Sequence, residues 1–157
     1  KRFTAAFEAK AVAKVYHGIL AGIPQETEGR IELALAKISS AEKGWRMIPA
    51  KKGKPSTTDW RVIATNPGHA LVEFHPATGR THQIRVHAAS GIGIALLGDP
   101  VYGSRTGAPR TMLHASAITV AREGKTDIAA TSPLPADFAA LGFELAEIAA
   151  PGHGDDT

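Results

Sequence analysis

A run of thirteen residues, from position 75 to position 87, constrains the fold of this chain more than any other segment. It reads His-Pro-Ala-Thr-Gly-Arg-Thr-His-Gln-Ile-Arg-Val-His. The segment Ala70–His75 predicts a strand, residues 75–79 predict a turn, and Thr81–Ala89 predicts a helix. A strand therefore turns directly into a helix here, and the junction carries two arginines, a glutamine and three histidines.

This junction has the chemistry of an anion site. The start of a helix presents free backbone N–H groups and the positive end of the helix dipole, which suit a phosphate. Arg80 and Arg85 add fixed charge and forked donors. On a helix over residues 81–89, Thr81 and Arg85 share one face, whereas His82 and Gln83 point elsewhere. One arginine can then reach outward to an anionic partner while the other points into a cleft.

The rest of the chain reads mainly as strands joined by turns. The expected strands are Val12–Leu20, buried on much of both faces, Gly29–Ile38, Thr57–Thr65 and Met112–Val120. Gly29–Ile38 also permits a helix through its Ala and Leu content. Asn66–Gly68 is expected to join Thr57–Thr65 to Ala70–His75 as a hairpin, and helices are expected at Lys1–Lys10 and near Ala136–Leu141. This pattern predicts an α+β fold with a mixed or antiparallel sheet.

Composition describes an ordinary soluble domain. The chain has 157 residues, of which 43% are hydrophobic and 21% are charged. No apolar run approaches the roughly 18–20 residues that cross a bilayer. Cysteine is absent, which excludes disulfides and thiolate metal sites and agrees with a reducing compartment. We therefore expect a cytoplasmic protein.

Charge is distributed unevenly along the chain. Residues 43–125 contain twelve Lys or Arg and four acidic residues, whereas residues 126–157 contain six acidic residues and no Lys or Arg. A basic loop, residues 51–56, lies in the first region. A basic body with an acidic tail is typical of a polyanion-binding protein, although a solvated charged surface gives the same pattern. Residues 146–157 are expected to be a disordered tail.

Several single residues have a structural and a functional interpretation. His82 and His87 are five positions apart, whereas helical metal ligands are four apart, and no carboxylate lies between Glu73 and Asp99. We therefore predict no metal site. Asp99 before a proline is expected to cap a turn, with Tyr102 packing beside it. Trp45 and Trp60 lie near the basic loop and could stack on bases, but packing in the core is the commoner role.

Five segments occur together in a characteristic order. They are Lys14–Tyr16, Gly53–Val62, Thr78–His87, Gly98–Gly103 and Leu113–Ala115. This ordered set resembles the RluA-type pseudouridine synthases of the RluA/RsuA superfamily, which isomerise uridine in structured RNA. The resemblance extends from about Phe3 to Phe143. It implies a pseudouridine synthase-like α+β fold, with a mixed, largely antiparallel sheet flanked by helices and loops.

The resemblance also implies a mechanism. Such enzymes use no cofactor or metal, and they flip the target uridine out of the RNA into a cleft. An aspartate attacks, the glycosidic bond breaks, the uracil turns, and carbon 5 is joined to the ribose before it loses a proton. Tyr16 matches the tyrosine that packs on the base and is implicated in that proton removal. Arg85 matches the residue that pairs with the aspartate and keeps it ionised, and Leu113 matches the wall of the uracil pocket.

Further residues are expected to contact RNA. Arg80, His82 and Gln83 should face RNA or stabilise the motif. The expected phosphate contacts are Lys51, Lys52, Lys54 and Arg105. The expected partner is structured RNA, either ribosomal or transfer RNA, and the protein is expected to be a monomer that binds neither membrane nor metal.

One feature of the family pattern is missing from the sequence. The nucleophilic aspartate of these enzymes sits in a His-Arg-Leu-Asp segment followed by Thr-Ser-Gly, and neither occurs here. In the family it precedes the Lys-x-Tyr strand by a few tens of residues, but only fifteen residues precede Tyr16. Asp59 and Asp99 lie nearest the motifs, in contexts that do not match. We expect residues 1–145 to be the C-terminal portion of a catalytic domain, inactive alone. The alternatives are a noncatalytic RNA-binding module with this scaffold, or a small α+β enzyme of another class that uses the histidines.

Overall fold

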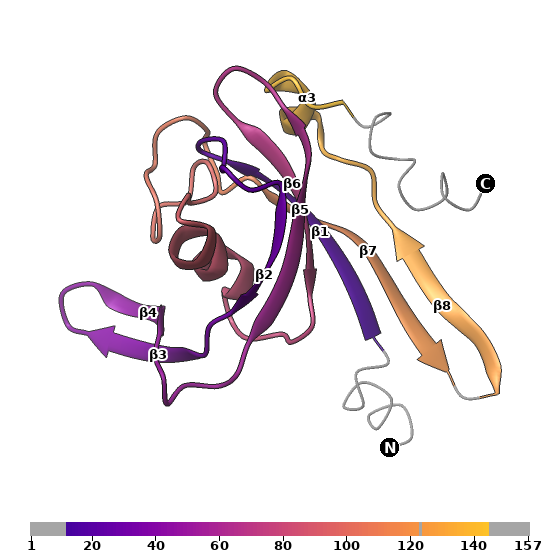
Figure 1. Ribbon diagram of the computed structural model, residues 1–157, viewed down its shortest axis with the longest axis horizontal. Coiled ribbons are helices and arrows are strands. Elements are labelled where there is room, and N and C mark those ends of the chain that lie inside the picture. Colours follow the sequence, from indigo (N-terminus) through magenta and orange to yellow (C-terminus); the bar gives the residue numbers. More distant parts are fainter. Residues whose placement is uncertain (1–11, 123, 145–157) are drawn as a thin grey trace.

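Six strands form one twisted sheet in the computed structural model, which describes residues 12–122 and 124–144 (Figure 1). These strands are β1 (Val12–Leu20), β2 (Glu28–Glu32), β5 (Thr57–Thr65), β6 (Ala70–Pro76), β7 (Leu113–Arg122) and β8 (Lys125–Thr131). Their order is β2-β5-β6-β1-β7-β8, and every pairing in the described residues is antiparallel. Because β1 lies between β6 and β7, Tyr16 is a neighbour of Phe74 on one side and of Ala115 on the other.

Smaller elements surround this sheet. Strands β3 (Leu35–Ser40) and β4 (Gly44–Pro49) form a separate hairpin, which projects from the sheet on the side of the motif helix (Figure 1). That helix consists of α2 (Gln83–Val86) and a π-helical continuation, η1 (His87–Ile92), and a third helix, α3, spans Ala136–Ala140. In the described part of the chain, no helix has the length and apolar character needed to span a membrane.

Both faces of the central strands are buried, each in its own core. Leu20 and Val72 point to one face and pack with Ile84 of α2. The alternate residue Ile19 points to the other face, where Phe138 of α3 covers it. Since side chains alternate along a strand, the motif helix and α3 cover opposite faces of the sheet. This double burial confirms the prediction for Val12–Leu20.

The segment predicted as one element, Gly29–Ile38, was interpreted wrongly. The chain leaves β2 after Glu32 and begins β3 at Leu35, and the two strands belong to different sheets. Strands β4 and β8 were not expected either. The predicted hairpin of Thr57–Thr65 with Ala70–His75 is confirmed as β5 and β6. The helix expected at Lys1–Lys10 and the tail at residues 146–157 lie outside the described residues.

The motif helix is shifted relative to its predicted span of residues 81–89. Helix α2 begins at Gln83, because His82 before it adopts a left-handed backbone conformation with φ of 54°. Gly91 lies inside η1, and a Cβ there would lie 2.6 Å from Cγ2 of Ile31, so glycine lets β2 approach the helix. Gly93 ends the helix with φ of 92°. Thr81 therefore lies outside the helix and shares no helical face with Arg85.

A buried carboxylate joins three strands on the α3 face of the sheet. Glu73 of β6 accepts a hydrogen bond from Arg61 Nε at 2.8 Å, and His75 Nε2 lies 3.2 Å from the same oxygen. His17 Nε2 lies 3.6 Å from the second oxygen, longer than a hydrogen bond, while its Nδ1 is 2.6 Å from Ser116 Oγ. His17, His75 and Arg61 together hold the pKa of Glu73 far below its usual range, against the effect of burial.

Replacing Glu73 with glutamine should lower the free energy of unfolding by on the order of 2 kcal/mol at pH 7, because a neutral amide loses the charge-assisted contacts. Folding lowers the pKa of Glu73, so this stabilisation is complete above its ordinary pKa of 4.5. It is lost progressively as the pH falls from that value toward the much lower pKa of the folded state. Urea unfolding at pH 7, 5 and 3.5 measures the difference, with exposed Glu28→Gln as the control. A difference independent of pH would contradict this account.

Candidate active site

A pocket of about 270 Å³ opens between the motif turn and the middle of β1. Tyr16 from β1, Arg85 from α2 and Leu113 from β7 all line it. The antiparallel pairing of β1 with β7 brings Leu113 opposite Gly18, beside Tyr16. The predicted convergence of these three residues on one cleft is therefore observed. Their catalytic roles stay predictions.

A β-bulge lies beside the pocket. The register of β1 with β7 shifts between Val15 and Tyr16, and such bulges redirect the side chains next to them. Lys14 and Tyr16 both line the pocket, and Lys14 Nζ lies 3.6 Å from the place that a Cβ on Gly79 would occupy. The ammonium group thus lies against the motif turn. The sequence interpretation assigned Lys14 no role, although its spacing of two from Tyr16 puts both on one face of the strand.

Positive charge dominates this pocket. Lys14, Arg80 and Arg85 line it, and none of the described residues that line it carries a carboxylate. Walls of one charge sign raise the local concentration of the oppositely charged ligand. The pocket is therefore suited to a phosphate or a carboxylate together with a planar apolar group beside Tyr16 and Leu113.

Gln83 holds the motif turn against β5. Its Nε2 donates to the carbonyl of Thr57 at 3.0 Å and to Thr58 Oγ1 at 2.9 Å. Its Oε1 accepts from Thr78 Oγ1 at 2.7 Å and from the backbone N–H of Arg80 at 3.0 Å. These four bonds use the whole hydrogen-bonding capacity of a buried amide. The structure supports the stabilising role expected for Gln83, whose side chain has no free group left for RNA.

His87 extends this network into the core. The hydroxyl of Thr58 accepts a hydrogen bond from Gln83, so its own hydrogen can be donated to His87 Nδ1 at 2.8 Å. The other ring nitrogen of His87, Nε2–H, donates to the carbonyl of Leu33 at 3.0 Å. Burial lowers the pKa of His87, which agrees with a neutral ring. Within residues 12–122 and 124–144, no three His, Asp or Glu side chains are grouped to hold a metal ion. His87 is thus a structural residue and is not free to act on a substrate.

Arg85 forms a two-pronged ion pair with Asp99. Its Nε donates to Oδ2 at 3.0 Å and its Nη2 donates to Oδ1 at 2.7 Å. Asp99 is fully buried, and Oδ1 also accepts the backbone N–H groups of Val101 and Tyr102. Burial disfavours the charged carboxylate, but the bonds from Arg85 and the loop outweigh it, so the pKa of Asp99 lies below its usual value. The predicted turn cap is confirmed, whereas the ion pair was not foreseen.

This pairing limits what Arg85 can still bind. Its Nη1 donates to His82 Nε2 at 3.0 Å, so three of its five N–H groups are engaged inside the chain. One N–H remains on each of Nη1 and Nη2. A second anion in the pocket can be bound only by these two groups, while Asp99 keeps the guanidinium in place.

His82 connects the motif to the β3–β4 hairpin. Arg85 can only donate, so His82 Nε2 accepts, and Nδ1–H then donates to Tyr102 Oη at 2.8 Å. Tyr102 Oη also accepts the backbone N–H of Met47 at 3.0 Å, and the His82 ring stacks on Trp45 with a centroid distance of 4.9 Å. Burial and then the charge of Arg85 lower the pKa of His82. These contacts hold His82 in a backbone conformation that is strained for a residue other than glycine.

The other predicted RNA contacts lie outside the pocket. They are Lys51, Lys52, Lys54 and Arg105, all exposed. The basic loop is fixed to β3 by reciprocal backbone bonds between Lys54 and Leu35, and Arg80 Nε donates to the carbonyl of Pro55 at 3.0 Å. The structure therefore brings the basic loop to the motif turn, and positive charge continues from the pocket onto this loop.

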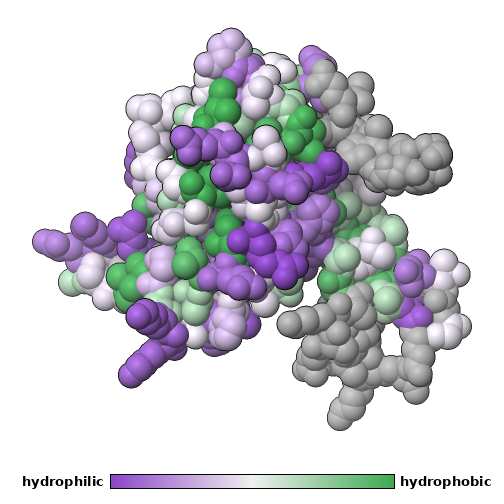
Figure 2. Space-filling view, in the orientation of Figure 1, coloured by the Kyte–Doolittle hydropathy of each residue, from purple (hydrophilic) through white to green (hydrophobic). Residues whose placement is uncertain are grey.

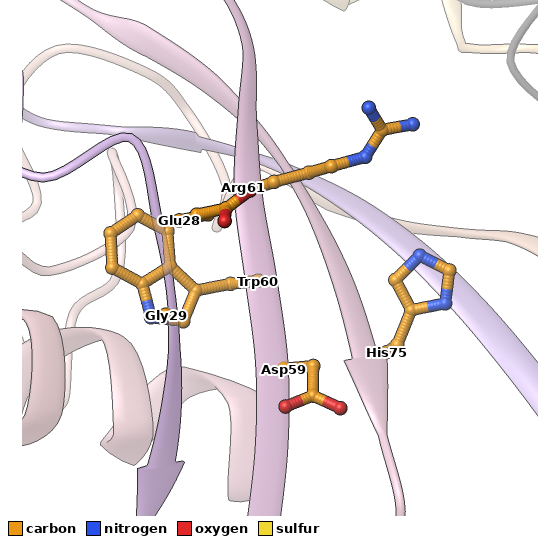
Figure 3. Close-up of a pocket in the computed structure, with 6 residues that line it drawn as sticks. All are labelled: Glu28, Gly29, Asp59, Trp60, Arg61 and His75. Carbon is orange, nitrogen blue, oxygen red and sulfur yellow. The ribbon is translucent and has the colours of Figure 1, made fainter.

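A second pocket, of about 340 Å³, lies at β2, β5 and β6 (Figure 3). Figure 3 shows the Trp60 indole on the helix side of β5 and His75 on the opposite side. Glu28 and Asp59 line this pocket, and Asp59 already pairs with Arg30 at 2.7 Å. Its two carboxylates make it a poorer site for an anion. We therefore assign the candidate active site to the smaller, cationic pocket.

Comparison with known proteins shows the family of this chain. A family model described as RNA pseudouridylate synthase matches residues 1–90. An uncharacterized RNA pseudouridine synthase of Zymomonas mobilis is 48% identical over 145 residues, which cover 91% of this chain and 66% of that protein. The solved human RNA pseudouridylate synthase domain containing 1 is similar with a TM-score of 0.70 and 28% identity, over 84% of this chain and 58% of that one. The chain belongs to the RNA pseudouridylate synthase family.

The chain spans only part of its relatives. It covers 42% of an uncharacterized RNA pseudouridine synthase of Synechocystis, to which it is 33% identical. It covers 35% of the ribosomal large subunit pseudouridine synthase D of Zymomonas mobilis, with 35% identity over 113 residues. The relatives thus contain sequence that has no counterpart in these 157 residues.

Replacing Asp99 with asparagine should lower the free energy of unfolding by about 3 kcal/mol, because it leaves Arg85 partly buried without its counter-charge. Asp59→Asn is the matched control, since it breaks the two-pronged pair with Arg30, which is exposed. The control should cost less than about 1 kcal/mol. Urea unfolding of the three proteins at pH 7 measures both values. Equal losses would show that burial of the Arg85 pair contributes nothing.

Proposed function

We propose that the full-length protein is an RNA pseudouridine synthase that acts as a monomer on uridine in structured RNA, ribosomal or transfer RNA. The observation that carries this proposal is the meeting of Tyr16, Arg85 and Leu113 in one cationic pocket of a chain that belongs to this family. One relative is named for the ribosomal large subunit, which supports ribosomal RNA as a substrate to test first.

In the proposed reaction the nucleophilic aspartate comes from a segment outside these 157 residues. The two free N–H groups of Arg85 hold its carboxylate ionised and oriented toward the flipped-out uridine. The carboxylate attacks carbon 1′ of the ribose as the bond from N1 to that carbon breaks. The uracil turns, and its carbon 5 bonds to carbon 1′ as the bond to the carboxylate breaks, which frees the aspartate. Tyr16 stacks on the uracil and its hydroxyl assists loss of the carbon 5 proton, while N1 gains a proton. Leu113 forms the apolar wall.

Asp99 and His82 act on this reaction through Arg85. Asp99 fixes the side of the guanidinium that faces the protein, and His82 fixes Nη1. His82 and His87 of the motif are engaged in internal bonds, which argues against an enzyme of another class that uses them for catalysis. The contacts from Asp99 and His82 matter because an arginine that is already held in place loses little freedom when it binds a carboxylate.

The full-length protein should release tritium from carbon 5 of labelled uridine in RNA, and the 157-residue chain alone should release none. Arg85→Ala should reduce kcat by at least about 100-fold, because the nucleophile loses its partner. Tyr16→Phe should reduce kcat and leave the Kd for RNA nearly unchanged, because the ring is kept and only the hydroxyl is lost. Ile23→Ala, at an exposed apolar residue that does not line the pocket, is the control.

Two results would contradict this proposal in different ways. RNA binding by the full-length protein without tritium release would support the noncatalytic RNA-binding module instead. Robust release by the 157-residue chain alone would show that the nucleophile lies within it, and Asp59 or Asp99 would then have to be tested.

RNA binding by the full-length protein should weaken as salt rises, because each phosphate contact releases counterions. Replacing Lys51, Lys52 and Lys54 together with alanine should reduce the slope of log Kd against log salt by about 2, at roughly 0.7 per contact for a single strand. Filter binding between 50 and 300 mM KCl measures the slope. Arg30→Ala is the control, because Arg30 is an exposed residue of β2 that already pairs with Asp59. An affinity that does not change with salt would contradict the phosphate contacts.

A further inference from the structure

The β3–β4 hairpin carries a large aromatic side chain on its surface. Trp45 of β4 is 44% exposed, whereas Trp60 of β5 is 7% exposed and belongs to the core. Of the two tryptophans near the basic loop, only Trp45 is thus available to a partner. An indole placed in solvent leaves a wide apolar surface uncovered, and aromatic side chains of this kind are the usual platforms for nucleic-acid bases.

Trp45 is held in place on one side. Its ring stacks on His82 with a centroid distance of 4.9 Å and an angle of 23° between the rings. His82 is fixed in turn through both ring nitrogens, by Tyr102 and Arg85. Lys37 on the neighbouring strand places its ammonium 4.7 Å from the Trp45 ring. Lys37 is exposed and its side chain is flexible, so this contact can be exchanged for another one.

The surroundings of Trp45 attract a polyanion. Residues 35–55, which form the hairpin and the loop after it, contain one acidic residue, Glu42, and six basic residues. The basic residues are Lys37, Lys43, Arg46, Lys51, Lys52 and Lys54. Figure 2 shows hydrophilic side chains at the projecting end of the hairpin and on the loop that follows β4. An aromatic platform among lysines and arginines is the arrangement that binds unpaired nucleotides.

The position of Trp45 relates it to the candidate active site. His82, on which Trp45 stacks, lines the cationic pocket with Tyr16 and Arg85. We propose that Trp45 is a stacking site for an unpaired base of the RNA, next to the uridine that enters the pocket. When the base stacks on Trp45, the Lys37 ammonium leaves the ring and contacts the phosphate of that nucleotide. This inference rests on the proposed function, because it places the neighbour of the target uridine.

The test uses the full-length protein and a stem-loop RNA of 17 nucleotides with uridines in its unpaired loop. Trp45→Ala should weaken binding about 5- to 150-fold, the range found when an aromatic stacking partner is removed. Trp45→Phe should stay within about threefold of the wild type, because it keeps a stacking ring. The RNA should quench a component of the tryptophan fluorescence that Trp45→Phe abolishes. Thermal unfolding checks that both variants are folded.

Ile38→Ala is the matched control. Ile38 lies on the same hairpin with the same exposure of 44%, and it pairs with Arg46, one position from Trp45, so it points to the other face. Its replacement should leave the Kd unchanged. Wild-type affinity in Trp45→Ala, or equal losses in Trp45→Ala and Ile38→Ala, would overturn the inference.

Tritium release separates this inference from the proposed function. At saturating RNA, Trp45→Ala should lose far less kcat than Arg85→Ala, because Trp45 lies outside the pocket and reaches Arg85 only through His82. A wild-type protein that releases tritium while Trp45→Ala binds normally would refute the stacking site alone. A wild-type protein that binds RNA through Trp45 but releases no tritium would refute the proposed function and leave the stacking site supported.

Discussion

The buried ion pair between Arg85 and Asp99 is the interaction on which the candidate site depends. It fixes Arg85 of α2 to the Gly98–Gly103 loop. Asp99 also accepts hydrogen bonds from the backbone N–H groups of Val101 and Tyr102, and these bonds hold the loop itself in place. A buried pair of this kind is held together because removing either partner leaves a charge in a medium of low polarity. The orientation of Arg85 toward the pocket follows from this pairing, and so does the environment of His82.

A second consequence is that distant surface elements are mechanically joined to the site. Tyr102 comes from the loop that Asp99 orders, and its hydroxyl meets both His82 and the backbone of Met47 in the hairpin. Trp45 then stacks on His82. The hairpin therefore has a defined position relative to the pocket although it belongs to a separate two-stranded sheet. An RNA strand that entered the pocket would meet a fixed surface on this side.

Much of the fold could be predicted from local patterns, and the failures have local causes. The predicted bounds of Val12–Leu20 and Thr57–Thr65 are those of β1 and β5. Both segments combine β-branched residues with side chains that alternate between two faces, and both end at turn signals. Gly29–Ile38 failed because Leu33 and Ala34, where the chain leaves one sheet for another, are not turn formers. Strand β8 reads Lys-Thr-Asp-Ile-Ala-Ala-Thr and has little apolar pattern, so only its pairing with β7 defines it.

The family, the order of the motifs and the residues that meet could all be predicted from the sequence, because they depend on residue types at fixed spacings. How those residues are engaged depends on the tertiary structure. Gln83 and His87 are bound internally, Asp99 is the partner of Arg85, and Trp45 rather than Trp60 faces solvent. Hydrogen bonds and burial join residues from different strands, and the sequence pattern of a single segment does not specify them. Side-chain roles at the site therefore follow from packing, whereas the site's location follows from the sequence.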